Sequence, residues 1–421
     1  MIGNSRLAAD RRRGLLDELA RDYGTPLYAY QLDAVRDAVD GLRRSLPDEV
    51  RLLYSAKANP HPAILRTVTA AGAGLELSSV GEVGAATGIG APTTELLYTG
   101  PGKTTEEMAS AIRDGVRRFS IESLTDRDRL VAAAGDTGVE YLVRINAPGR
   151  RRGAGLRMTG GPSQFGVDSA DLVSTPELLR PAAGARPVGF HIFSATNVPD
   201  EAALLTELET NIGTAVWAAE QTGFTATTID IGGGFGAPYA APGHRPHYGG
   251  LRDELTRLLD RSLPGWRSGE PWVVVESGRH LVAESGTLLT TVLDVKTSGP
   301  HTYLVCDAGI NALGGMHGLG RLLAPAAQPT DPDGDGTATP TVMVGPLCSP
   351  LDILSRSATV ARPAVGQVLA IPNVGAYGLT ASLVAFLGRE LPVEVALDGD
   401  EVVEARRLSL VASAAPRRRP S

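Results

Sequence analysis

The sequence has little cysteine, no excess of positive charge and no long hydrophobic run. Its two cysteines among 421 residues, Cys306 and Cys348, cannot form a disulfide framework, so we expect a reducing, cytoplasmic location. The formal net charge of −7 argues against nucleic acid as a partner. The arginines at positions 11–13 are not followed by the apolar core of a signal peptide. The longest apolar candidate, residues 383–387, is far too short to span a membrane.

Glycine and proline, by contrast, are abundant, with 50 and 29 residues, which predicts many tight turns. Hydrophobic residues make up 43% of the chain and charged residues 21%, as is ordinary for a globular protein. A chain of this length exceeds what one small core requires, so we expect two domains.

Between about residues 50 and 285, short β-rich runs alternate with longer stretches of helical character. This alternation predicts a parallel (β/α)8 barrel, in which catalytic residues gather at the carboxyl ends of the strands. The eight expected strands are residues 51–54, 74–77, 96–99, 118–121, 141–145, 189–193, 228–231 and 272–275.

From residue 286 onward the pattern changes to β-rich runs separated by Gly and Pro, which predicts a second, all-β domain. Its expected strands are residues 287–296, 302–306, 341–344, 367–371 and 393–396. Before the barrel we expect an amphipathic helix over residues 8–23 and a short strand over residues 27–30. The basic tail from Pro416 is expected to be disordered.

Two segments could suggest metal binding, but neither fits it well. The loop of residues 324–340 contains Asp331, Asp333 and Asp335 at the spacing of a calcium loop, yet Val342 occupies the place of the required glutamate. His244 and His247 lack cysteine or acidic partners at metal-ligand spacing. We therefore expect a solvated turn in the first segment and no metal site.

A lone lysine follows the first barrel strand, in the sequence Tyr-Ser-Ala-Lys-Ala-Asn-Pro. Lys57 has no acidic neighbour in sequence, and the Asn-Pro step behind it turns the chain. An exposed loop lysine is usually only a solvated charge. A desolvated one could instead form a Schiff base with an aldehyde.

Three further strand ends carry groups suited to an anionic, ring-containing ligand. The glycines Gly232, Gly233 and Gly234 would present backbone N–H groups to an anion, or could simply form a flexible turn. Glu276, after a Val-Val-Val strand, could hold a heterocyclic N–H or pair with Arg279. His191 could stack on a ring or be a core histidine.

Two residues of the second domain are also candidates. Cys348, in Gly-Pro-Leu-Cys-Ser-Pro, could act as a loop acid, whereas Cys306 lies within a strand and is expected to fill the core. Tyr377, flanked by glycines, could donate its hydroxyl to a phosphate, or pack in the core.

Together these motifs resemble the fold-type III pyridoxal-phosphate decarboxylases, the group of the ornithine and diaminopimelate decarboxylases. The resemblance extends from Thr25 to about Val395, and the motifs occur in the family's order. It implies a cofactor-binding (β/α)8 barrel over residues 31–285 and a C-terminal β domain over residues 286–412, the alanine racemase-like fold. Residues 1–30 would pack with the β domain, and residues 413–421 would form a disordered tail.

The resemblance also implies roles for individual residues. Lys57 would be the Schiff-base lysine, with Glu76 as a nearby acid. Arg144 would approach the ring oxygen, His191 would stack on the ring, and Glu276 would pair with the pyridine nitrogen. The residues that would hold the phosphate are Ser194, Gly232, Gly233, Gly234, Gly278, Arg279 and Tyr377.

Cys348 and Asp352 would reach into the active site of another subunit, which implies a homodimer with shared sites. An acid at the pyridine nitrogen keeps the ring protonated, so that it can accept the electrons left by departing CO2. Cys348 would then return a proton to Cα. An alanine racemase would be expected to present an arginine to that nitrogen, so Glu276 argues against a racemase.

The sequence differs from those of the decarboxylases of free amino acids at positions that would lie near the distal end of the substrate. Ser349, at a substrate-facing position, replaces an acid that receives the distal amino group of diaminopimelate. The segment after Asp307-Ala-Gly-Ile-Asn311 runs on to Ala312 and lacks the family's arginine. A distal charge would have no partner there, which is costly when buried.

The segments at residues 157–161, 164–166, 345–350, 375–379 and 386–388 resemble more closely the subgroup that decarboxylates aminoacyl groups held on an acyl carrier protein in antibiotic biosynthesis. It includes the glutamyl enzyme of the butirosin route and enzymes that supply macrolactam starters. We expect a glutamyl, aspartyl or 3-methylaspartyl group, with Arg150, Arg151, Arg152 and Arg157 either attracting an acidic carrier or forming a solvated loop. The alternatives are a decarboxylase of free diaminopimelate, ornithine or lysine, and a cofactor-binding regulator without catalysis.

Overall fold

The computed structural model describes residues 2–146, 156–157, 163–314, 326–330, 339–361 and 363–414. For residues 2–10, 156–157 and 339 it describes the backbone alone. The described chain divides into two compact units. Residues 32–238 and 243–285 form the first, which we call the barrel unit. Residues 2–31, 239–242 and those from 286 onward form the second, the β unit.

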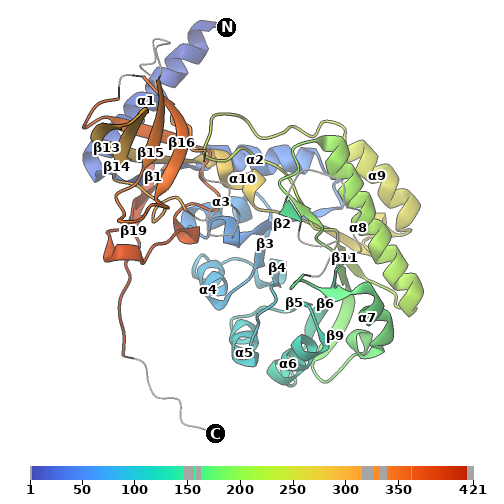
Figure 1. The fold of residues 1–421 in the computed structure, drawn as a ribbon. Helices are drawn as coiled ribbons and strands as arrows, with labels where there is room; N and C mark the ends of the chain where they lie inside the picture. The colour runs from blue at the N-terminus through green and yellow to red at the C-terminus, as the bar shows by residue number, and fades with distance from the viewer. Residues whose placement is uncertain are drawn as a thin grey trace. The chain divides into compact units, whose positions relative to one another are not determined.

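The barrel unit contains a closed parallel barrel of eight strands (Figure 1). Each neighbouring pair is parallel, and closure comes from the pairing of β12 with β2 and of β5 with β6. The predicted fold class and all eight predicted strands are therefore confirmed. The barrel strands are β2 (Arg51–Ser55), β3 (Gly74–Leu77), β4 (Leu96–Tyr98), β5 (Arg118–Ile121), β6 (Val139–Asn146), β9 (Ala185–His191), β11 (Thr228–Asp230) and β12 (Trp272–Ser277).

Helices follow most of the strands, and polar caps explain where several begin. The side chains of Ser79, Thr104, Ser123 and Asp200 accept hydrogen bonds from first-turn N–H groups, and Thr104 with Glu107 forms a full capping box. The helices are α2 (Leu32–Arg44), α3 (Pro62–Ala70), α4 (Val80–Gly88), α5 (Thr105–Arg113), α6 (Leu124–Ala134), α7 (Ser169–Ser174), α8 (Glu201–Thr222), α9 (Leu251–Ser262) and α10 (Arg279–Val282).

Apolar side chains fill the barrel interior, so that it is a packed core rather than a pore. Leu53, Leu97, Leu142, Val188 and Val274, from five different strands, form one buried cluster. Three short strands lie beside the barrel. They are β7 (Leu156–Arg157), which pairs with β10 (Ala195–Thr196), and β8 (Val167–Asp168), which extends the pairing of β6.

The β unit is built around one eight-stranded sheet. Its path is β16-β15-β14-β13-β1-β18-β19, and β17 pairs with β13. The strands are β1 (Leu27–Gln31), β13 (Gly286–Ser298), β14 (His301–Cys306), β15 (Thr339–Val344), β16 (Ile353–Val360), β17 (Val368–Pro372), β18 (Val393–Asp398) and β19 (Glu401–Arg407). Five of them match the predicted β-rich runs and β1 matches the strand predicted over residues 27–30, whereas β16 and β19 were not predicted.

The N-terminal segment belongs to this sheet. β1 is antiparallel to β13 and parallel to β18, and helix α1 (Ile2–Tyr23) places Leu19 in a buried cluster with Leu27, Leu289 and Val395. Burial of these apolar side chains holds the first residues against strands from the far end of the chain. No helix in the described part of the chain has both the length and the apolar character to cross a bilayer.

Candidate active site at the carboxyl ends of the barrel strands

Lys57 lies one turn after β2, in a short 3-10 helix (Ala56–Ala58). The turn is held by hydrogen bonds from Tyr54 Oη to the Asn59 carbonyl (2.9 Å) and from His61 N to Asn59 Oδ1 (3.0 Å). The Lys57 side chain is 42% exposed, so its amine can be reached from outside while its backbone is fixed.

Glu76, at the end of β3, is the partner of Lys57. Its two carboxylate oxygens lie 3.0 and 3.3 Å from Lys57 Nζ, and it also accepts hydrogen bonds from the hydroxyls of Ser78 and Thr99. Burial alone would raise the pKa of Glu76, but Lys57 and the hydroxyls of Thr99 and Ser55 outweigh it and lower the pKa to about 2. Glu76 is therefore ionised near neutral pH.

Two further buried ion pairs lie in the same unit. Arg144, on β6, donates to Glu122, which follows β5, at 3.0 Å, and both side chains are buried. The other oxygen of Glu122 accepts from Gly166 N. Lys103 pairs with Asp126 at 2.8 Å, again with both side chains buried. Like Lys57, each of these cations already has a carboxylate partner.

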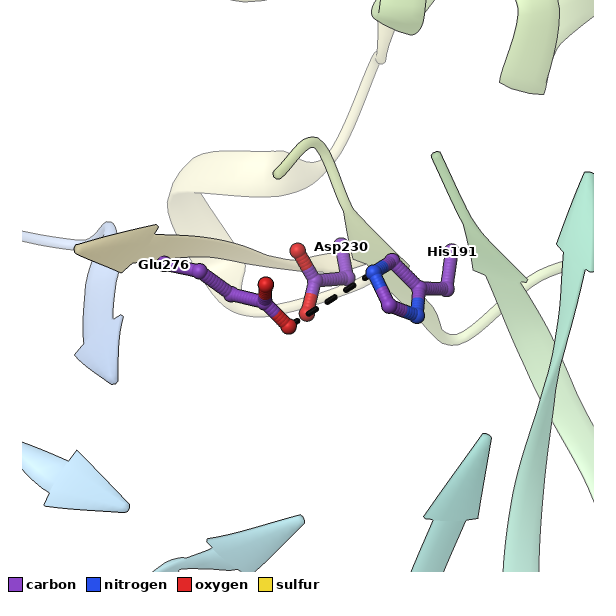
Figure 2. Close-up of side chains that lie close together, drawn as sticks. All are labelled: His191, Asp230 and Glu276. Atoms are coloured by element: carbon purple, nitrogen blue, oxygen red, sulfur yellow. Dashed lines mark ion pairs between the residues drawn. The ribbon is translucent and has the colours of Figure 1, made fainter. Parts of the chain in front are cut away.

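A third group of side chains comes from β9, β11 and β12. Strand register brings it together, since His191 and Asp230 are direct Cα partners and Asp230 pairs with Val274, two residues before Glu276. Figure 2 shows the three side chains converging, with His191 Nε2 3.5 Å from Glu276 Oε1. One polar side-chain atom from each of the three lies within 4.8 Å of the others.

The electrostatics of this group differ from those of Glu76. Burial, and then the neighbouring Asp230, raise the pKa of Glu276 well above its ordinary value. Burial also raises the pKa of Asp230, to about 7. For His191, burial and then Arg144 lower the pKa well below the usual range, so the imidazole is neutral. Its Nδ1 lies 2.8 Å from Ser120 Oγ.

The three glycines after β11 pack where no side chain could fit. A Cβ on Gly233 would lie 1.8 Å from the Glu276 carbonyl oxygen, and one on Gly232 would lie 2.6 Å from that of Ile192. Gly232 and Gly234 have φ values of +69° and +103°. A Cβ on Gly278 would lie 3.1 Å from Ala58 Cβ and 3.3 Å from Ser55 Cβ, beside the Lys57 turn, and buried Arg279 begins α10.

Ser194, expected at the phosphate, donates to Glu207 Oε2 at 2.8 Å. Its hydroxyl is thus engaged by a carboxylate, a contact that the sequence did not predict. Asp230 and Glu122 were likewise not assigned roles from the sequence. The available signal was a single acid within or directly after an otherwise apolar strand.

The remaining candidates lie on the β unit. Cys348 is exposed, and Tyr377 has φ +53° and accepts a hydrogen bond from Tyr239 through its carbonyl. Asp352 was expected to reach a substrate, but it is only 2% exposed. Its two oxygens accept from Ile310 N (2.8 Å) and Leu347 N (2.7 Å). In this unit, its contacts therefore favour a role in linking the Cys348 loop to the loop after β14.

Several expected features lie outside the described residues. They are Arg150, Arg151, Arg152, the side chain of Arg157, the aspartates at 331–335 and the basic tail.

Comparison with known proteins identifies the family. The pyridoxal-binding domain of the pyridoxal-dependent decarboxylases matches residues 32–283. The diaminopimelate decarboxylase of Zymomonas mobilis is 28% identical over 405 residues, covering 93% of this chain and 92% of the relative. The L-glutamyl-(BtrI acyl-carrier protein) decarboxylase of Niallia circulans is 25% identical over 391 residues, covering 90% of each chain.

A solved structure supports the fold. The diaminopimelate decarboxylase of Helicobacter pylori, complexed with L-lysine, superposes with a TM-score of 0.79 at 23% sequence identity. The match covers 93% of this chain and 95% of that one.

The residues of the barrel unit fit pyridoxal phosphate. Lys57 offers a reachable amine, and the glycines after β11 leave backbone N–H groups without side chains in front of them. Glu276 Oε1 is a buried acceptor with no hydrogen-bond donor among the described residues, which suits a ring N–H. The chain belongs to the pyridoxal-dependent decarboxylases and is an amino acid decarboxylase that uses pyridoxal phosphate.

Proposed function

We propose that the protein removes the α-carboxylate of an amino acid carried as a thioester on an acyl carrier protein, with glutamyl, aspartyl and 3-methylaspartyl groups as candidates. The observation that carries this proposal is the pairing of charges at the barrel mouth. Lys57, Lys103 and Arg144 each contact a carboxylate of the same unit. A distal carboxylate would have to displace one of these buried partners, whereas a neutral thioester needs none.

The β unit supports the same conclusion. Ser349, which replaces the acid of the free-substrate enzymes, uses its hydroxyl to accept from Leu351 N at 3.2 Å. Ala312 is fully buried, and its carbonyl accepts from Tyr28 Oη at 2.8 Å. Neither residue presents a charge to the far end of a substrate.

A second candidate is the decarboxylation of a free amino acid. The names of the relatives back this alternative better than the carrier-bound substrate. Besides that of Zymomonas mobilis, diaminopimelate decarboxylases of several other organisms match most of the chain, and one matching relative acts on an acyl-carrier-protein substrate. The two candidates differ at the distal end of the substrate and share the chemistry at Cα.

For either substrate, the same residues of the chain would have the following roles. When bound, pyridoxal phosphate draws off the electron pair left as CO2 departs. Lys57 would carry the cofactor, and Glu276 would accept a hydrogen bond from the ring nitrogen. His191, neutral and flat, would pack on the ring, and Arg144 would approach its oxygen.

The phosphate and the returning proton involve other groups. The phosphate would be held by the N–H groups of the glycines at 232–234 and 278 and by Ser194, Arg279 and Tyr377, with Ser194 first leaving Glu207. Cys348 Sγ would return a proton to Cα.

We further propose a homodimer with shared active sites. Exposed apolar side chains surround the Cys348 loop on the β unit. Leu351 is 74% exposed, and Leu383, Phe386 and Leu387 are 50%, 41% and 53% exposed. Their two loops are joined by a hydrogen bond from Arg389 to the Pro346 carbonyl. A second copy would cover this surface and receive Cys348.

The intact mass of an acyl carrier protein tests the substrate. The carrier is loaded in turn with glutamate, aspartate and 3-methylaspartate and weighed before and after incubation with the protein and pyridoxal phosphate. We expect one loaded form to lose the mass of one CO2, and the Lys57→Ala variant to leave it unchanged. Release of CO2 from free diaminopimelate, ornithine or lysine, with every carrier unchanged, would overturn the carrier-bound proposal and establish the second candidate.

A further inference from the structure

We infer that Asp230 and Glu276 share a single proton, and that Asp230 is thereby the positioning residue for the carboxylate proposed to meet the ring nitrogen. The inference rests on the proposed role of Glu276 but not on the identity of the substrate. Asp230 is one of the residues to which the sequence motifs gave no role.

The first argument is that a carboxylate oxygen of Asp230 and one of Glu276 lie within 4.8 Å of each other, in a buried group (Figure 2). Asp230 is 0% exposed and Glu276 2%. Asp230 Oδ1 accepts from Gly232 N at 2.8 Å, which fixes the carboxyl group. Asp230 Oδ2 and Glu276 Oε1 have no hydrogen-bond donor among the described residues. Two buried anions facing each other without donors are strongly unfavourable, and one shared proton removes both the repulsion and the missing donor.

The second argument is that the surrounding charges do not remove the need for this proton. Lys57, Glu76 and Arg144 also act on the pair, and His191 Nε2 lies 3.5 Å from Glu276 Oε1. Lys57 is paired with Glu76, Arg144 is paired with Glu122, and His191 is neutral. No cation of this set is left to neutralise a second negative charge.

The consequence concerns the orientation of Glu276. A proton held between the two carboxyls ties Glu276 to Asp230, whose own position is set by the backbone of Gly232. The Glu276 carboxyl is thus held in place, with its remaining acceptor capacity left for the ring N–H. The atoms balance without any other reactant, because the pair holds one proton and carries one negative charge.

The test is the pH dependence of thermal stability of the full chain freed of cofactor, measured from pH 5.5 to 8.5 with EDTA present. A shared proton is bound in the folded state and absent from the unfolded carboxylates, so wild-type stability falls as pH rises through this range. Asp230→Asn keeps the acceptor for Gly232 N and gives Glu276 an N–H donor. We expect its Tm relative to wild type to rise by on the order of 2–4 °C between the two pH limits.

Two other variants make the result decisive. Glu276→Gln should flatten the pH profile in the same way, and it decides the outcome if Asp230→Asn does not fold. Glu82→Gln is the control, because burial raises the pKa of Glu82 to about 7 and it titrates in the same range. Glu82→Gln should remove the contribution of Glu82 to the pH dependence of Tm and leave the contribution of the Asp230–Glu276 pair in place. Parallel Tm curves for wild type, Asp230→Asn and Glu276→Gln would overturn the inference.

Cofactor affinity separates positioning from direct contact. Asp230→Asn should bind pyridoxal phosphate within about threefold of wild type, whereas Asp230→Ala and Glu276→Gln should bind at least about tenfold more weakly, roughly 1.4 kcal/mol. Equal weakening by Asp230→Asn and Asp230→Ala would contradict rescue by the isosteric amide. None of these measurements includes a substrate, so failure of the carrier assay leaves their outcome unchanged.

Discussion

On the two sides of the barrel mouth, the pKa values of buried carboxyl groups are shifted in opposite directions. On the β2–β3 side, Glu76 is 1% exposed and its pKa falls to about 2. On the β11–β12 side, Glu276 is 2% exposed and its pKa rises well above the ordinary value. Burial is the same in the two places, so the partners decide. A lysine and two hydroxyls stabilise the first anion, and a second carboxyl opposes the other.

The difference matches two kinds of chemistry. An ionised Glu76 holds the Lys57 amine in place, whereas a group that keeps a proton close by suits the neighbourhood of a basic ring nitrogen. The following predictions test each side separately, beginning with the largest expected effect.

Replacing Lys57 should remove the function of the β2–β3 side of the barrel mouth. Lys57→Ala should lower the decarboxylation rate by at least about 10³-fold, because the covalent attachment point of the cofactor is lost. It should also destabilise the fold, since Glu76 would remain buried without its cation. Lys57→Arg is the matched control, measured by thermal unfolding and by CO2 release. Stability should return and activity should not. Activity close to that of wild type in either variant would exclude the proposed role.

Replacing Glu276 should impair the function of the β11–β12 side of the barrel mouth. Glu276→Gln should lower kcat by about 10²- to 10³-fold, because the ring nitrogen loses its anionic partner. Rates of CO2 release at saturating cofactor measure this effect independently of binding. Glu82→Gln provides the comparison, as it removes a partly buried carboxyl of the same barrel unit. If both variants lose activity equally, the loss reflects charge in general rather than contact with the ring.

The proton-returning group can be tested on the β unit. Cys348→Ala should lower kcat by about 10²-fold and leave the free energy of unfolding nearly unchanged, because the side chain is exposed. Cys306→Ala is the opposite case, since that thiol is buried within β14 and its loss should cost stability without slowing the reaction. Activity retained by Cys348→Ala would show that another group supplies the proton.

The loss of stability at acidic pH tests the lowered pKa of Glu76. The Glu76 pKa is lowered from 4.5 to about 2, so its contribution is complete above pH 4.5 and is lost as pH falls towards 2. The shift corresponds to about 3 kcal/mol, and Glu76→Gln should remove this part of the acid-induced loss. Unfolding by urea at pH 3 and pH 6 measures it. The same difference for wild type and variant would contradict the assignment.

The smallest expected effect concerns Asp352. Asp352→Ala should cost about 1–3 kcal/mol of stability, because two buried N–H groups lose their acceptor. Asp352→Asn, which keeps one acceptor, should cost less. Both are measured by urea unfolding. A large change in KM with unchanged stability would favour the substrate contact expected from the sequence.

The sequence predicted the barrel because its signal is local. Each strand is a short β-rich run, and helix starts such as Thr104 carry their own capping residues. The missed strands show the limit of that signal. β19 mixes charged residues with short apolar ones at a sheet edge, and β16 contains Ser, Arg and Thr, so neither has a strong apolar pattern. Their pairing partners, rather than their composition, make them strands.

The candidate site was only partly predictable for a related reason. Lys57 and Glu276 stand in recognisable sequence contexts. The meeting of Asp230 with Glu276 depends on the register between β11 and β12, and the contact of Ser194 with Glu207 depends on how α8 packs. Neither spacing along the chain nor residue type contains that information.

The position of β1 between β13 and β18 has a consequence for synthesis on the ribosome. The barrel strands are contiguous in the chain and can pair as soon as they emerge. β1 is made before all of them, yet its two partners appear only after the barrel is complete, and β18 comes almost last. The nascent chain must therefore keep this strand unpaired during most of translation, which leaves the segment open to non-native pairing until its partners are made.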